Sequence, residues 1–164
     1  MKMTELFLGE LERETGSTRR ALERVPEGRY DWKPHDKSMG LGYLAELVAR
    51  LPSWTVFTIK QDNLDLATYK AQPWRTTREL LEGFDESVAG AREALANTTD
   101  EHLLKPWQLL IGGRVVLEQP RHVVLRDSVF SHLAHHRGQL TVYLRLLDLP
   151  VPAIYGPSAD EKTF

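Results

Sequence analysis

Cysteine is absent from the 164 residues of this chain. Its absence excludes disulfide bonds, thiolate ligands for a metal and a cysteine nucleophile. A chain without cysteine is also typical of a reducing cytoplasm. Any thiol chemistry on this protein therefore needs a thiol that comes from another molecule.

Long apolar runs and an excess of one charge are also missing. No stretch approaches the apolar length that spans a bilayer, and Met1–Glu5 lacks the features of a signal peptide. The 21 basic and 23 acidic residues give a net charge of -2, which provides no general attraction for nucleic acid or an anionic membrane. We expect a cytoplasmic protein that binds neither nucleic acid nor membrane.

Apolar residues that recur every three or four positions predict four helices. The predicted helices cover about residues 4–23, 38–59, 76–97 and 120–148. Ser38 is the expected N-cap of the second helix, and Pro52 should kink that helix because it lacks a backbone donor. Thr76 and Glu79 have the spacing of a capping box at the start of the third helix.

The segment before the last predicted helix has the pattern of a β-hairpin. Trp107–Ile111 and Arg114–Glu118 flank Gly112 and Gly113, which can adopt the positive φ angles of a tight turn. Residues 62–73 read as a loop. A chain of this length forms one domain, residues 1–164. The expected class is all-α, an antiparallel four-helix bundle with a small β-hairpin before the last helix.

Three of the six histidines lie within residues 131–140. His132 and His136 are four residues apart, so on a helix their Cβ atoms lie about 5–6 Å apart on one face. This spacing suits two ligands of one metal ion, while His135 points about a quarter-turn away. Taken alone, the spacing favours the other interpretation, two core-facing imidazoles hydrogen-bonded to Tyr, Gln or carboxylate groups.

Other charged and polar side chains have plainer interpretations. Glu10 and Glu14 lie beside the apolar stripe of the first helix and are expected to be solvated at its rim. Arg137 is expected on a partly exposed helix surface or in a polar network at the end of the bundle. His102 and His122 are expected to be solvated.

Three segments carry a family resemblance. They are Leu44–Trp54, Ser131–Leu140 and Pro152–Glu161, and they resemble the DinB superfamily of damage-inducible, YfiT-like proteins over nearly the whole chain. The resemblance implies a four-helix bundle, a homodimer, and a zinc or nickel ion held by three histidines. One of these histidines comes from the second helix and two from an H-x-x-x-H pair on the last. Characterised relatives include transferases and an isomerase that use a small-molecule thiol, such as bacillithiol or mycothiol.

By this resemblance, His132 and His136 match the H-x-x-x-H pair, but the position of the second-helix histidine holds Leu47. Glu46 points about 100 degrees away from position 47 around a helix, and His35 lies in the loop before that helix. The third ligand is therefore open.

Two hypotheses follow from the resemblance. One is a metal-dependent hydrolase or thiol S-transferase with a divalent metal at His132 and His136, in which Arg137 or Tyr143 orients an anionic substrate. The other is a metal-free, non-catalytic dimeric binding or scaffold protein in which Leu47 fills the ligand position. Neither the substrate nor the catalytic residues are identified by the sequence.

Overall fold

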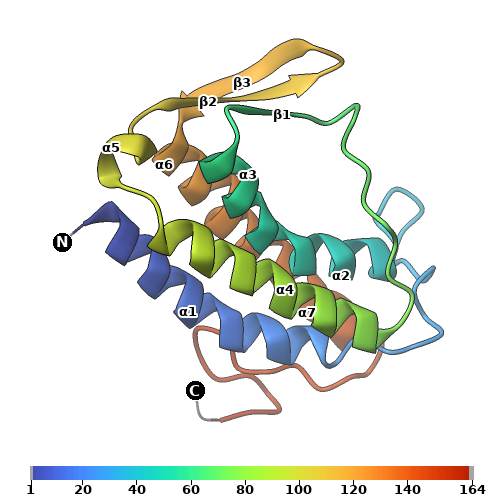
Figure 1. Cartoon of the computed structure of the whole chain (residues 1–164). Helices are drawn as coiled ribbons and strands as arrows, with labels where there is room; N and C mark the ends of the chain where they lie inside the picture. Colours follow the sequence, from blue (N-terminus) through green and yellow to red (C-terminus); the bar gives the residue numbers. More distant parts are fainter. Residues whose placement is uncertain (1, 163–164) are drawn as a thin grey trace.

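The computed structural model describes residues 2–162, and helices make up most of the chain (Figure 1). The α-helices are α1 (Met3–Leu22), α2 (Leu41–Arg50), α3 (Trp54–Lys60), α4 (Thr77–Ala96), α5 (Asp100–Leu103), α6 (Arg121–Val124) and α7 (His132–Leu146). A 3₁₀ turn, η1 (Leu51–Ser53), joins α2 to α3, and a π-helical segment, η2 (Leu125–Ser131), joins α6 to α7. The strands are β1 (Asn63–Asp65), β2 (Pro106–Ile111) and β3 (Arg114–Pro120).

The helices pack lengthwise around one main apolar core. Helix α4 lies against α1, α2 and α3, and α7 lies against α2 and α1 (Figure 1). Each helix turns its apolar stripe inward, as the periodicity of the sequence predicts. The fold is therefore mostly helical with one small sheet at its side.

The helix starts agree only in part with the sequence prediction. Thr76 and Glu79 form the predicted capping box of α4, with the Glu79 N–H donating to Thr76 Oγ1 at 3.1 Å. The prediction for Ser38 is wrong, because α2 begins after Gly40 without a side-chain cap. Its first two N–H groups donate instead to the carbonyl oxygens of Trp32 and Tyr30, at 2.8 and 2.9 Å. The preceding loop thus caps this helix with its own backbone.

Two interruptions divide the longer helical segments. The kink predicted at Pro52 falls at η1, the 3₁₀ turn between α2 and α3. The predicted single last helix is wrong, since it contains the π-helical segment η2. A π-turn is wider than an α-turn, and Val129 and Phe130 of this segment both lie in the core.

The predicted hairpin is confirmed as β2 and β3, with positive φ at Gly112 and Gly113. The loop predicted for residues 62–73 is wrong at its start, because β1 pairs in parallel with β2 and makes the sheet three-stranded. The Asp65 carboxylate accepts the N–H groups of Gly112 and Gly113 at 2.9 and 2.7 Å. This side chain fastens the hairpin turn to the end of β1.

Two tryptophans pack against the sheet and the helices. Trp107 is buried beneath the sheet with Leu64 and Val124. Trp74 packs against Gly83 of α4, and the Arg50 guanidinium lies 3.6 Å over its ring. In the described part of the chain, no helix has both the length and the apolar character needed to cross a bilayer.

Candidate functional site

The first two turns of α7 bring His132 and His136 together. Their Nε2 atoms lie 2.7 Å apart and their ring centroids 4.5 Å apart. His136 is 8% exposed and His132 is half-buried. The two residues are called the histidine pair below.

The outer nitrogen of one ring of the pair faces an oxygen acceptor. Nδ1 of His136 lies 2.7 Å from Gln139 Oε1. An imidazole that donates from Nδ1 keeps a lone pair on Nε2 when it is neutral. The contact with Gln139 Oε1 thus assigns to His136 the tautomer whose Nε2 is free to accept.

The Nε2 lone pair of His136 faces Nε2 of His132 across 2.7 Å, so a proton or a metal cation must lie between the two nitrogens. A shared proton satisfies this at the observed distance. A metal cation satisfies it as well. Two nitrogens bound to one tetrahedral zinc at about 2.0–2.1 Å lie roughly 3.3 Å apart, which a small outward rotation of either ring supplies.

Protonation of the pair is made less favourable by its surroundings. Burial lowers the pKa of His132, and the neighbouring His136 and His135 lower it further, while the Ser128 carbonyl raises it. A lowered pKa keeps the ring neutral near neutral pH. A neutral ring with a fixed tautomer is the form that binds a metal ion.

The chain supplies two ligands here rather than three. Among residues 2–162, no group of three or more His, Cys, Asp or Glu side chains is placed to hold a metal. Leu47 of α2 is half-buried against the main core. The two substitutes considered from the sequence are engaged elsewhere. Glu46 lies 3.8 Å from Arg50, and Nδ1 of the exposed His35 accepts the Lys37 N–H.

Comparison with known proteins places the chain in a family. The model of the DinB family matches residues 1–163. The chain belongs to the DinB family. This confirms the resemblance that the three sequence segments suggested.

Relatives of this DinB-family chain cover nearly its whole length. It is 26% identical over 157 residues to the uncharacterized protein YrdA of Bacillus subtilis (strain 168), covering 94% of this chain and 89% of YrdA. Its fold is similar to the crystal structure of a DinB-like protein from Bacillus cereus ATCC 10987, with a TM-score of 0.69 and 23% identity. That match covers 92% of this chain and 97% of the other.

A second solved structure is that of the DinB-like protein YjoA from Bacillus subtilis. It matches with a TM-score of 0.72 and 18% identity, over 96% of this chain and 99% of that one. At these identities the two structures establish the shared fold.

Several polar residues of this DinB-family chain that the sequence suggested as functional or solvated lie away from the histidine pair. The Tyr143 hydroxyl donates to the Met39 carbonyl at 3.2 Å, and its ring meets the edge of Trp32. His102 and His122 were predicted to be solvated, but both are half-buried. Their rings lie 2.9 and 3.1 Å from the carbonyl oxygens of Ile59 and Leu103, so they join helices and loops.

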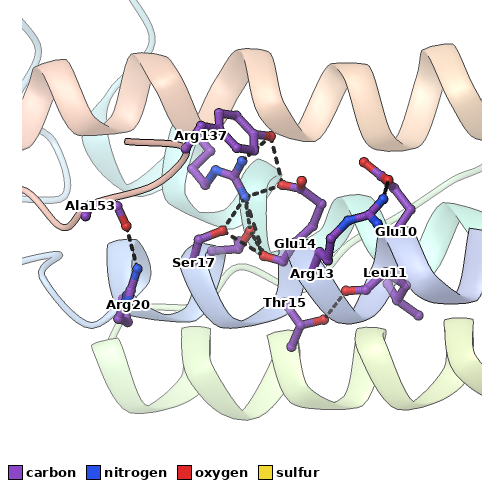
Figure 2. A network of polar contacts seen from close by, with 11 residues as sticks. Glu10, Leu11, Arg13, Glu14, Thr15, Ser17, Arg20, Arg137 and Ala153 are labelled. Atoms are coloured by element: carbon purple, nitrogen blue, oxygen red, sulfur yellow. Dashed lines mark hydrogen bonds and ion pairs between the residues drawn. The ribbon is translucent and has the colours of Figure 1, made fainter. Parts of the chain in front are cut away.

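Arg137 and Glu14 form a buried ion pair between α7 and α1 (Figure 2). The arginine side chain is 1% exposed and the glutamate side chain 7%, and Arg137 Nη1 lies 2.6 Å from Glu14 Oε2. The expectations of a solvated Glu14 and of a partly exposed Arg137 are therefore wrong, whereas the alternative expectation for Arg137, a polar network, agrees with these contacts. Glu14 lies three positions after the buried Leu11 and four before the buried Thr18. This helical spacing was the sequence feature that could have predicted the burial of Glu14.

The buried arginine has several further acceptors. Nη1 also donates to Ser17 Oγ and Thr18 Oγ1 at 2.9 and 2.8 Å, and Nη2 donates to the Tyr155 hydroxyl at 2.5 Å. That hydroxyl in turn donates to Glu14 Oε2 at 2.9 Å. Because Tyr155 belongs to the C-terminal segment, this network holds the end of the chain against α1 and α7.

Proposed function

We propose that this DinB-family protein binds one divalent cation, zinc or nickel, through Nε2 of His132 and Nε2 of His136. The observation that carries the proposal is the direction of the two rings. Nε2 of His132 and Nε2 of His136 converge to 2.7 Å, and Nδ1 of His136 faces Gln139 Oε1 on the outer side of the pair. Such outer hydrogen bonds are the usual means by which proteins orient metal-binding histidines.

The second part of the proposal is a reaction class, a thiol S-transfer or a hydrolysis. A divalent cation at such a site lowers the pKa of a thiol or water bound to it, which yields a nucleophile near neutral pH. The chain contributes two imidazoles and an apolar Leu47 on the facing helix α2. The remaining ligands therefore come from solvent or from a small-molecule thiol, and the chain itself has no cysteine to compete for them.

A second candidate function is metal-free binding or scaffolding. The observation that favours it is the apolar Leu47 together with the lack of a third donor side chain among residues 2–162. In this account the histidine pair shares a proton and stabilises α7. The two candidates make opposite predictions for the affinity of the protein for zinc.

Zinc affinity measured by competition with a chromophoric chelator separates the candidates. The wild-type protein should bind one equivalent, and His136→Ala should weaken binding by more than about tenfold. Leu47→His should strengthen it by adding a third ligand. His35→Ala, which removes an exposed histidine outside the pair, is the matched control and should change nothing. A full equivalent retained by His136→Ala would rule out the assigned site, and an inert Leu47→His would rule out simple replacement of the third ligand.

The proposed assembly is a homodimer of antiparallel four-helix bundles, as the family resemblance implies. Val142 and Leu146 support it, because they lie one turn apart on α7 and are 57% and 56% exposed. Adjoining exposed apolar residues of this kind can form part of a patch that meets a partner. Light scattering coupled to size-exclusion chromatography should give twice the mass of one chain, and a monomer at all concentrations would contradict the assembly.

A further inference from the structure

A cavity of about 280 Å³ lies between α1, the segment from η2 into α7, and the C-terminal residue Tyr155. Its apolar walls are Phe7, Phe130 and Ala134, with Leu6 at the edge. The rings of Phe7 and Phe130 are parallel, with centroids 5.7 Å apart. Cavities near this volume and with mostly apolar walls are typical binding places for small molecules.

The cavity is separate from the histidine pair. Ser131 and Ala134 of the π-helical segment and α7 line it, whereas neither His132 nor His136 does. Residue 134 lies about 200 degrees around a helix from residue 132 and about 160 degrees from residue 136. The two places therefore use opposite faces of one helix, and a ligand in the cavity has no contact with the proposed metal ligands.

Two carboxylates of α1, Glu10 and Glu14, line the same cavity. They are four residues apart and share one face of the helix (Figure 2). Glu14 Oε2 takes both contacts of the buried network, from Arg137 Nη1 and from the Tyr155 hydroxyl. Within residues 2–162, Glu14 Oε1 accepts no hydrogen bond and remains available to a donor.

The positive charges near the cavity are already engaged. Arg126 lines the cavity, but its guanidinium donates to both carboxylate oxygens of Asp127, at 2.7 and 3.1 Å, and its side chain is 67% exposed. Arg13 pairs with Glu10 on the solvent side. Among residues 2–162, an anionic ligand in this cavity would thus meet two carboxylates and no free cation. A cationic donor would gain a charge-assisted hydrogen bond at Glu14.

We propose that this cavity binds a small organic amine. Its protonated amino group donates to Glu14 Oε1 and lies near Glu10, while an aromatic or branched aliphatic body packs on Phe7 and Phe130. The ammonium head supplies the donor that Glu14 lacks. The apolar body covers walls that are otherwise open to water.

The test compares three probes that share a phenyl ring and differ in the head group. They are 2-phenylethylamine, 2-phenylethanol and 3-phenylpropanoate, each titrated into the ¹⁵N-labelled full chain at neutral pH and followed by amide shifts. The amine should bind at least tenfold more tightly than the alcohol or the acid. Shifts should centre on residues 6–14 and 130–134.

Variants locate the binding place. Ala134→Leu fills the cavity with a good helix former and should weaken amine binding by more than tenfold, and Ser131→Leu on the same wall should act likewise. Ala89→Leu, at an exposed alanine of α4, is the matched control and should bind as the wild type does. Glu10→Gln should reduce the preference for the amine over the alcohol without unfolding the protein, since its carboxylate lies at the solvent edge.

Three results would overturn the proposal. One is the absence of saturable amine binding at millimolar concentrations. Another is equal affinity for the three head groups, which would remove the role of the carboxylates. The third is unchanged amine binding in both Ala134→Leu and Ser131→Leu, which would place the ligand elsewhere.

Discussion

At the scale of single residues, the Glu14–Arg137 pair has the largest expected effect on stability. Both side chains are almost fully buried, and the arginine also donates to two hydroxyls of α1. Removing one partner of such a pair leaves an uncompensated charge in the interior. The pair therefore fixes how α1 and α7 face each other, and through Tyr155 it also positions the C-terminal segment.

Arg137→Ala should lower the free energy of unfolding by about 3–5 kcal/mol, because Glu14 then remains buried without its cation. Urea denaturation followed by circular dichroism measures the loss. Arg92→Ala is the control, since Arg92 makes a bidentate ion pair with Glu12 on the surface. Removing an exposed pair costs about 0–1 kcal/mol. Equal losses in the two variants would show that burial of the Glu14 pair has no special role.

The sequence predicted one of the two residue-level sites better than the other. The spacing of His132 and His136 depends only on helix geometry, so their approach could be foreseen from the chain. The Glu14–Arg137 contact could not, because its partners are 123 positions apart and are brought together by packing. An isolated carboxylate beside an apolar stripe has the same local pattern whether it is solvated or paired.

At the scale of secondary-structure elements, the N-terminus of α1 is capped from a distance. The Asp100 carboxylate, at the start of α5, accepts the N–H groups of Met3 and Thr4 at 3.0 and 3.1 Å. These hydrogen bonds lower the pKa of Asp100 below its usual value, and the bond from the Met3 N–H has the largest effect. The free N–H groups in the first turn of α1 thus find their acceptor in Asp100, a residue that follows α4.

Asp100→Ala should lower the urea midpoint at neutral pH, because two N–H groups of α1 lose their acceptor. The pH dependence has a definite sign. A carboxyl whose pKa is lower in the folded state stabilises the protein above its unfolded pKa of about 3.8 and loses this effect as the pH falls through the folded value. The stability difference between wild type and variant should therefore shrink below about pH 4.

Asp36→Ala is the control for this cap. Asp36 is exposed in the loop before α2, and its side chain accepts no hydrogen bond within residues 2–162. This variant should keep the urea midpoint of the wild type at neutral pH. A difference between Asp100→Ala and wild type that persists unchanged at pH 2 would contradict a role for the ionised carboxylate.

Gly83 of α4 makes room for the Trp74 ring. A Cβ atom at position 83 would lie 2.0 Å from Trp74 Cζ2, so the ring would have to move. Gly83→Ala should cost about 1–3 kcal/mol through overpacking. Gly9→Ala in α1, where no atom lies within 4 Å of the added carbon, should instead stabilise by up to about 1 kcal/mol. Thermal unfolding of both variants measures the contrast, and stabilisation by Gly83→Ala would contradict the close packing.

The elements that could be predicted are those that local chemistry specifies. The capping box of α4, the interruption at Pro52 and the glycine turn of the hairpin all follow from short-range rules. Strand β1 could not be predicted, since three residues carry no usable period and their conformation comes from pairing with Gln108–Leu110. The π-helical segment was also missed, because its apolar residues fit an α-helix about as well.

At the scale of the whole molecule, α7 separates two chemically different places. The histidine pair lies on the side of α7 that carries Tyr143. The cavity lined by Glu10 and Glu14 lies on the side that carries Ala134 and faces α1. The C-terminal segment reaches the second side and is held there by several contacts. Besides Tyr155, Glu161 accepts the Ala153 N–H and pairs with Arg24, while Arg20 donates to the Ala153 carbonyl. Truncation of this segment should therefore weaken amine binding in the cavity more than metal binding by the histidine pair.

The most direct test of the account is the metal content of the protein purified without a histidine tag, measured by elemental mass spectrometry. We expect about one zinc or nickel ion per chain, bound by the two imidazoles of the histidine pair. His136→Ala, purified in parallel, should contain none. Wild-type protein without metal, even after incubation with zinc or nickel, would contradict the proposed metal centre and favour a metal-free binding or scaffold protein.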